Sequence, residues 1–280
     1  MGNLAGPTVR ILALGDWRPG NVHAHWAADS RPRVAEVEAL IESAWEEASR
    51  RPEVFLFDGP MCRLESFDVS PAALRLVLGR TSYKAFLGTN MRHPEIAGAY
   101  GRSALANPLG VSCALESADG FLLLGRRNAT VAYYPSRVHP FAGALEPGDA
   151  ADVFGGVRRE LAEELSLTGD DVPPDALSCV GIAEDASLLQ PELIFHARCK
   201  PSRRQVESQL DPEEHRAIVA LPVDAPAATA ALRHAGDFTP VAVAAVLLWG
   251  RLAFGHAWFL AQCAALAVPT EGLSGHNPPQ

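Results

Sequence analysis

Three glutamates at helical spacing, between residues 159 and 167, constrain this chain more than any other feature of its sequence. In a helix, Glu160, Glu163 and Glu164 fall within roughly 100° of arc. Apolar residues occupy an adjoining face of the same helix, namely Phe154, Val157, Leu161 and Leu165. The pattern therefore predicts a helix that packs with one face and gathers three carboxylates on another.

Like charges on one helix face need a counterion or a solvated setting. Each neighbouring pair destabilises an isolated helix by roughly a few tenths of a kcal/mol. A divalent cation removes that repulsion, and Mg²⁺ takes carboxylate, water and phosphate oxygens in octahedral geometry, with Mn²⁺ as an alternative ion. The competing interpretation is a solvated acidic face whose charges pair with Arg158 and Arg159.

The surrounding residues resemble the Nudix hydrolase signature, in which Gly, five residues, Glu and seven residues precede Arg-Glu-apolar-any-Glu-Glu-any-Gly-apolar. Gly143 and Asp149 match its start, and residues 159–167 match its end. Asp149 stands where the family has Glu, nine residues instead of seven follow it, and Ser166 replaces a Gly. We expect the two extra residues in the loop or first helical turn around residues 152–156, because the paired glycines there weaken a helix.

A second resemblance points to one group of Nudix hydrolases. Segments 80–90, 107–111 and 181–183 are similar to the Nudix subfamily that hydrolyses UDP-glucose and UDP-galactose to UMP and the sugar 1-phosphate. The resemblance implies the same reaction here. Two alternatives stay open: a Nudix-fold nucleotide-binding module without turnover, and a hydrolase of another substrate such as ADP-ribose.

The resemblance also implies roles for the helix residues. Glu160, Glu163 and Glu164 would bind the metal, together with a backbone carbonyl near Ala142. Arg159 would pair with a carboxylate of the signature and fix its orientation. The general base would be Glu163 or Glu164, or a residue on a later loop, for which the chain offers Glu184, Asp185 and Glu192.

Candidate substrate-binding residues lie on both sides of position 104. Arg126 and Arg127 carry guanidinium groups that match phosphate oxygens, and we expect one of the two to be merely solvated. His139 precedes the signature. Upstream, Tyr83, Lys84 and Asn90 offer polar and aromatic groups for a pocket wall, unless their segment only docks onto the core. Spacing alone gives the nine histidines no metal-binding constellation.

Length and patterning predict an α/β protein. We expect an N-terminal α/β extension over residues 1–104 and a Nudix α/β/α sandwich with a mixed sheet over residues 105–280. Periodicity predicts a helix over residues 33–49, a short helix over 82–87 that ends at Gly88, and another over 202–210. Strands are predicted over 9–14, 62–69, 73–78, 111–116, 121–126, 179–183, 193–199 and 217–223.

Charge and cysteine usage narrow the partners and the compartment. The net charge is −9 and no basic run exceeds a pair, which argues against nucleic-acid binding. The five cysteines form no CxxC pair, which is typical of reduced thiols in a cytoplasmic protein, and the first residues do not resemble a signal peptide. The apolar stretch 241–268 is interrupted by polar residues and predicts buried helices, not a membrane span. The oligomeric state stays open.

Overall fold

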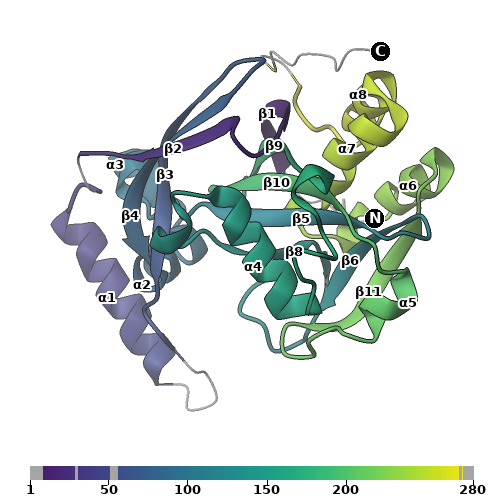
Figure 1. Ribbon diagram of the computed structural model, residues 1–280. Helices are drawn as coiled ribbons and strands as arrows, with labels where there is room; N and C mark the ends of the chain where they lie inside the picture. The colour runs from purple at the N-terminus through teal and green to yellow at the C-terminus, as the bar shows by residue number, and fades with distance from the viewer. Residues whose placement is uncertain (1–8, 29–30, 51–55, 271–272, 274–280) are drawn as a thin grey trace.

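A mixed eight-stranded sheet forms the centre of the molecule (Figure 1). The computed structural model describes residues 9–28, 31–50, 56–270 and 273. Within the sheet, β10 and β5 are parallel and the other pairs are antiparallel. The path runs β1 (Val9–Trp17), β9 (Leu177–Asp185), β10 (Gln190–Arg198), β5 (Gly110–Glu116), β6 (Phe121–Arg127) and β11 (His215–Pro222), with β7 (Val138–His139) on β6 and β8 (Phe141–Ala144) on β5.

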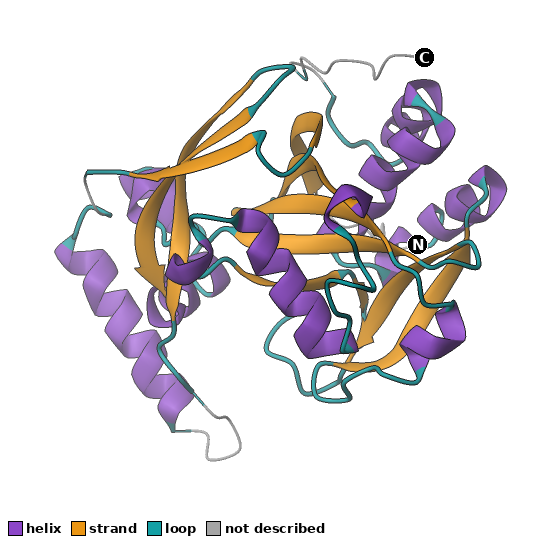
Figure 2. Ribbon diagram, viewed as in Figure 1, coloured by secondary structure: helices purple, strands orange, loops and turns teal. Residues whose placement is uncertain are grey.

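Helices cover both faces of this sheet, which confirms the predicted sandwich (Figure 2). On one face, α4 (Val153–Leu165) packs its apolar side against Val111, Cys113 and Leu115 of β5. On the other face, the alternate residue Ala114 belongs to the core built around α7 (Pro240–Phe254). The second core also includes α6 (Ala225–Leu232) and α8 (His256–Ala265). Side chains that alternate along one strand therefore supply two separate cores.

A second, three-stranded sheet lies beside the sandwich, where an N-terminal α/β extension was expected. Its order is β2 (Val22–Trp26), β4 (Leu74–Ser82) and β3 (Pro60–Val69). The helical segments beside it are α1 (Ala35–Ser49), α2 (Tyr83–Phe86), η1 (Leu87–Met91), α3 (Ile96–Tyr100) and η2 (Arg102–Ala104). Strand β1, although it comes first, pairs with β9 in the large sheet. The domain boundary at residue 104 stays a prediction. If the chain is divided according to its two sheets, β1 belongs with the sandwich.

The predicted helix end at Gly88 is wrong. The chain continues from α2 through Gly88 into the π-helical segment η1. A Cβ atom on Gly88 would lie 2.5 Å from the Ile41 Cα atom in α1. Gly88 is therefore needed for the close approach of two helical segments, and not as a helix cap.

The remaining elements connect the layers. They are η3 (Pro147–Asp149), η4 (Pro174–Ala176), α5 (Arg203–Glu207) and η5 (Ala235–Asp237). The apolar C-terminal stretch forms α7 and α8, and among the residues that the structure describes no helix has the length and apolar character of a membrane span. All five cysteines are buried and unpaired. The cytoplasmic location inferred from them stays a prediction.

Candidate active site

Helix α4 divides its three glutamates between the interior and the solvent. Glu160 and Glu164 are buried, whereas the side chain of Glu163 is 60% exposed. The helix begins at Asp152, whose carboxylate accepts a hydrogen bond from the Phe154 N–H. It ends at Ser166, which adopts a left-handed conformation at φ 53° where the Nudix signature has glycine. The departure at Ser166 thus leaves the shape of the helix end intact.

Glycine is required where β8 passes the helix. A Cβ atom at Gly143 would lie 2.2 Å from Glu160 Oε1, so any side chain there would displace the carboxylate. The adjacent Ala142 N–H donates a hydrogen bond to Glu164 Oε1 over 3.0 Å. The start of the signature therefore positions both buried carboxylates. Ala142 directly precedes the signature, and its role as a carbonyl ligand of the metal stays a prediction.

Arg159 links four acidic or carbonyl groups across the signature. Its guanidinium lies 2.8 Å from Glu160 Oε1, 3.3 Å from Glu163 Oε2 and 3.1 Å from Asp149 Oδ2. It also donates to the Ala144 carbonyl. The predicted pairing of Arg159 with a signature carboxylate is therefore present in the geometry. Asp149 reaches Arg159 despite its shorter side chain and the two additional residues that separate them.

His215, at the start of β11, completes the surroundings of Glu164. Its Nε2 atom lies 2.9 Å from Glu164 Oε2, and the imidazole is 1% exposed. Glu214 adds a third group, and one ligand atom from each of Glu164, Glu214 and His215 lies within 4.8 Å of the others. Spacing along the sequence missed this histidine, since the residues are 51 positions apart and only the sheet brings His215 to α4.

The position of His215 depends on a glycine in the neighbouring strand. A Cβ atom at Gly125 would lie 2.3 Å from His215 Nδ1, so β6 leaves room for the ring only because this residue has no side chain. The ring also meets Phe141 edge-on at 5.5 Å. A glycine two residues before Arg127 is the sequence signal that was available, but it does not identify the histidine.

Burial perturbs the ionisation of the two buried glutamates and of His215. Burial raises the pKa of Glu160 to about 8, Arg159 opposes the shift, and the carboxylates of Glu164 and Glu163 add to it. Burial, followed by the charge of Glu214, raises the pKa of Glu164 well above its usual range. Burial lowers the pKa of His215 to about 4. A bound dication favours ionised carboxylates and a neutral imidazole, so this donor set fits a divalent metal ion.

The two candidate phosphate-binding arginines point in different directions. Arg126 makes a bidentate pair with Asp237, at 3.0 and 2.7 Å, on the side of the sheet away from α4. Arg127 is buried, and its guanidinium lies over the ring of Tyr133 at 4.7 Å. Within the described part of the chain, Arg127 Nε has no hydrogen-bond partner. Arg127 is thus the arginine that faces the carboxylate cluster, and it opposes the pKa rise of Glu164.

The later candidate bases have different environments. Glu192 is buried, accepts a hydrogen bond from Ser112 Oγ, and has a pKa that burial raises to about 8. Its neighbours are engaged elsewhere: Glu184 pairs with Arg10 and Arg102, and Asp185 accepts a hydrogen bond from the Tyr134 hydroxyl at 2.6 Å. Among the described residues, Glu192 is therefore the later candidate without a hydrogen bond or ion pair to an arginine or tyrosine, and its role as a base stays a prediction.

His139 lies at the edge of the same region. Its Nδ1 atom is 2.8 Å from Thr239 Oγ1, and the ring is buried. Burial, reinforced by the charges of Arg127 and His215, lowers its pKa well below the usual range. This neutral ring supports the start of α7, which Thr239 caps, and its predicted contact with substrate stays a prediction.

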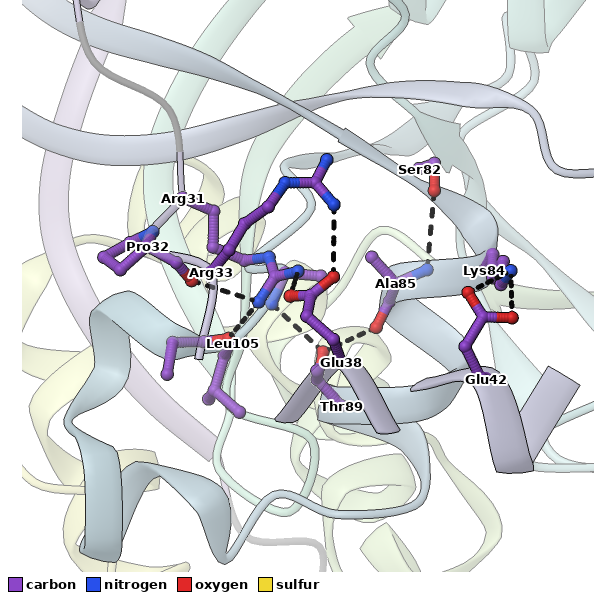
Figure 3. Close-up of polar contacts among 12 residues, drawn as sticks. Arg31, Pro32, Arg33, Glu38, Glu42, Ser82, Lys84, Ala85, Thr89 and Leu105 are labelled. Carbon is purple, nitrogen blue, oxygen red and sulfur yellow. Dashed lines mark hydrogen bonds and ion pairs between the residues drawn. The ribbon is translucent and has the colours of Figure 1, made fainter. Parts of the chain in front are cut away.

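The three upstream candidates have different contacts. Lys84 Nζ pairs with the Glu42 carboxylate of α1 at 2.7 Å (Figure 3). Asn90 is buried and donates to the carbonyls of Leu188 and Leu189 in the β9–β10 turn. These contacts favour structural roles for Lys84 and Asn90 over direct binding of substrate. Tyr83 packs edge-on against Trp45 and Phe86. Burial raises the pKa of Tyr133 to about 12, Glu192 and Glu214 add to the rise, and Tyr83 makes the smallest contribution.

Comparison with known proteins places this arrangement in a family. The NUDIX domain model matches residues 106–241, which include the signature, Arg127, Glu192 and His215. The uridine diphosphate glucose pyrophosphatase NUDT22 of Bos taurus is 33% identical over 226 residues, covering 68% of this chain and 76% of the relative. The human protein of the same name is 32% identical over 223 residues, covering 68% and 72% respectively.

The chain also has a weaker likeness to solved structures. A mutT/nudix family protein from Listeria innocua is 18% identical, with a TM-score of 0.40, and the match covers 55% of this chain and 98% of that protein.

Proposed function

The chain belongs to the Nudix hydrolase family and is a Nudix-type pyrophosphohydrolase, and from this premise we propose that it hydrolyses UDP-glucose or UDP-galactose to UMP and the sugar 1-phosphate. The reaction would require a divalent cation, Mg²⁺ or Mn²⁺. The observation that carries the substrate assignment is the likeness to two curated UDP-glucose pyrophosphatases across about two thirds of this chain. The buried carboxylate cluster of α4 supports the chemistry.

Glu160, Glu163 and Glu164 are the residues that would hold the metal, together with the backbone at Ala142. When bound, a divalent ion supplies charge stabilisation on the phosphate oxygens and lowers the pKa of a water molecule. The protein keeps the two buried carboxylates in place through Arg159 and the Ala142 N–H. These contacts are made in advance, so little reorganisation is needed when the substrate arrives.

Arg127 is the residue that we assign to the diphosphate. Its guanidinium is buried and stacked on Tyr133, and its Nε donor has no hydrogen-bond partner among the residues that the structure describes. Guanidinium groups bind phosphate oxygens through paired donors, and the stacked ring fixes the direction of the fork. In this proposal Glu163 or Glu192 is the general base and accepts the proton of the attacking water. The water oxygen is added to one phosphorus as the bridging P–O bond breaks.

A single product analysis tests the function. The purified protein is incubated with UDP-glucose, UDP-galactose, ADP-ribose and nucleoside triphosphates, each with Mg²⁺, with Mn²⁺ and with a chelator. We expect UMP and sugar 1-phosphate in equal amounts, and only when a metal is present. A preference for ADP-ribose or a triphosphate would reject the substrate, and tight UDP-sugar binding without products would favour a binding module.

We also propose that the N-terminal extension supplies part of the pocket through Tyr83. Its support is that Tyr83 adds, as the smallest of the causes, to the raised pKa of Tyr133, whose ring lies under the Arg127 guanidinium. Tyr83→Ala is expected to raise the KM for UDP-glucose several-fold, on the order of 1 kcal/mol of lost contact. Lys84→Ala, one residue away and paired with Glu42, is the matched control, and its KM is expected to stay within about twofold. Equal KM values for the two variants would show that α2 has only a packing role. The melting temperatures of both variants are measured to check their stability.

A further inference from the structure

Three side chains of kinds that can bind a metal, from two distant parts of the chain, meet at the C-terminal end of α4. Glu164 comes from the helix, His215 is the first residue of β11, and Glu214 lies in the turn just before that strand. One ligand atom from each lies within 4.8 Å of the other two. Glu164 and His215 are buried and Glu214 is exposed, so the cluster is fixed on its inner side and open to solvent on its outer side.

The separation between the two buried groups suits a shared ion. His215 Nε2 lies 2.9 Å from Glu164 Oε2. Adjacent ligands of an octahedral ion with bonds of about 2.1 Å are roughly 3 Å apart, and opposite ligands are roughly 4.2 Å apart. The buried pair therefore already has the spacing of adjacent ligands, and the exposed Glu214 needs only a small inward movement.

The imidazole is held so that one nitrogen faces the cluster. The Nδ1 atom is enclosed under Gly125, where no Cβ atom fits, and it has no hydrogen-bond partner among the described residues. Phe141 contacts the ring edge-on. Only Nε2 therefore connects His215 to Glu164, and the packing that fixes the ring also fixes the direction of that nitrogen.

We propose that His215, Glu164 and Glu214 together hold a divalent cation, through one imidazole nitrogen and carboxylate oxygens. The inference rests on the proposed function, since it assigns a ligand to an ion that the hydrolysis needs. An imidazole nitrogen favours transition-metal ions, whereas Mg²⁺ is bound mainly by oxygen and water. The site consequently prefers Mn²⁺ over Mg²⁺ more strongly than a site made only of carboxylates would.

The test compares metal affinities in the nucleotide-free protein. Free Mn²⁺ is measured by electron paramagnetic resonance during titration of the chelator-treated protein, and Mg²⁺ is measured by competition. His215→Gln keeps a hydrogen-bond donor for Glu164 but removes the imidazole. We expect its Mn²⁺ affinity to fall at least about tenfold and its Mg²⁺ affinity to fall less than about threefold. Equal losses for the two ions, or no loss, would overturn the proposal in favour of a histidine that only positions Glu164.

Neighbouring glutamates provide a matched pair of variants. Glu214→Gln removes a cluster carboxylate, and we expect it to weaken both ions by a few-fold. Glu213→Gln removes the same charge one residue earlier, outside the cluster, and is expected to leave both affinities unchanged. If Glu213→Gln weakened Mn²⁺ as much as Glu214→Gln, long-range charge and not coordination would explain the binding.

A spectroscopic measurement decides the question even if the histidine variant does not fold. Electron spin echo modulation of Mn²⁺ bound to the wild-type protein reports directly coordinated ¹⁴N. We expect a ¹⁴N signal in the wild type and its loss in His215→Gln, and a wild-type spectrum without ¹⁴N coupling overturns the assignment. Because no nucleotide is present, failure of UDP-glucose turnover would reject the proposed function without touching this result.

Discussion

Helices α4 and α7 pack on opposite faces of one sheet but bury different kinds of side chain. Twelve consecutive residues of α7, from Pro240 to Arg251, are buried, and all but Arg251 are uncharged. That arginine donates to the Gly15 carbonyl. Helix α4 instead buries the carboxylates of Glu160 and Glu164 within one turn of each other.

The difference separates what stabilises the fold from what serves the chemistry. Burial of apolar area in α7 lowers the free energy of the folded state. Burial of two carboxylates in α4 raises it, as their upward pKa shifts show. A bound cation would offset the free-energy cost of burying these two carboxylates. Helix α7 buries no such pair, so the cation is expected at α4.

The largest expected effect is on the α7 side. Trp249 is fully buried, and its indole N–H donates to Glu116. Trp249→Ala is expected to lower the free energy of unfolding by about 3–5 kcal/mol, because a large cavity replaces the indole. Urea unfolding measures the loss, and kcat per folded molecule should not change. The control Leu260→Ala in α8, at a side chain 41% exposed, should change stability by less than about 0.5 kcal/mol.

In α4, the second expected effect is the opposite one: activity is lost while stability is kept. Glu164→Gln is expected to reduce turnover of UDP-glucose by about 10²-fold or more, equivalent to about 2.7 kcal/mol of activation free energy. Stability should be maintained or increased, since a buried charge is removed. Glu163→Gln removes another proposed ligand and candidate base, so it is expected to reduce turnover as well. Near-normal turnover of Glu164→Gln at saturating Mg²⁺ would contradict the metal assignment, and steady-state kinetics with thermal melting supply both readouts.

The third prediction concerns Arg127, which faces α4 and is proposed to bind the diphosphate. Arg127→Lys keeps the charge but loses the paired donors, and we expect the KM for UDP-glucose to rise roughly tenfold, or about 1.4 kcal/mol. Arg126→Lys weakens the pair with Asp237 on the other side of the sheet and should change KM by less than about twofold. An equal rise in KM for the two variants would contradict the assignment of Arg127, and not Arg126, to the diphosphate. Initial-rate measurements over a range of UDP-glucose concentrations provide the comparison.

The smallest effect concerns the end of α4. Ser166→Gly removes a side chain from a residue at φ 53°, and the free energy of unfolding should rise by up to about 1 kcal/mol. Ser208 ends α5 at φ −75°, so Ser208→Gly is the matched control and should destabilise by a few tenths to about 1 kcal/mol. Urea unfolding of both variants checks the opposite signs. Destabilisation by Ser166→Gly would show that the serine side chain makes a necessary contact.

Local spacing predicted the elements that depend on nearby residues. The segment with the three glutamates forms α4, and most predicted strands differ from the observed ones by a few residues at their ends. The signature residues Gly143 and Arg159 lie against the buried carboxylates, and for Arg159 the resemblance had implied such a pairing. Local prediction failed at Gly88, where contact with α1 and not helix propensity determines the backbone.

The sequence by itself determined that one helix would present three carboxylates, because a helical repeat depends only on neighbouring residues. Tertiary structure decided which two are buried and what surrounds them. The pairing of β11 with β6 places His215 beside Arg127, under Gly125 and against Glu164. Strand alternation sends Arg127 toward this cluster and Arg126 toward Asp237. Sheet register joins residues far apart in sequence, so no spacing along the chain specifies these contacts.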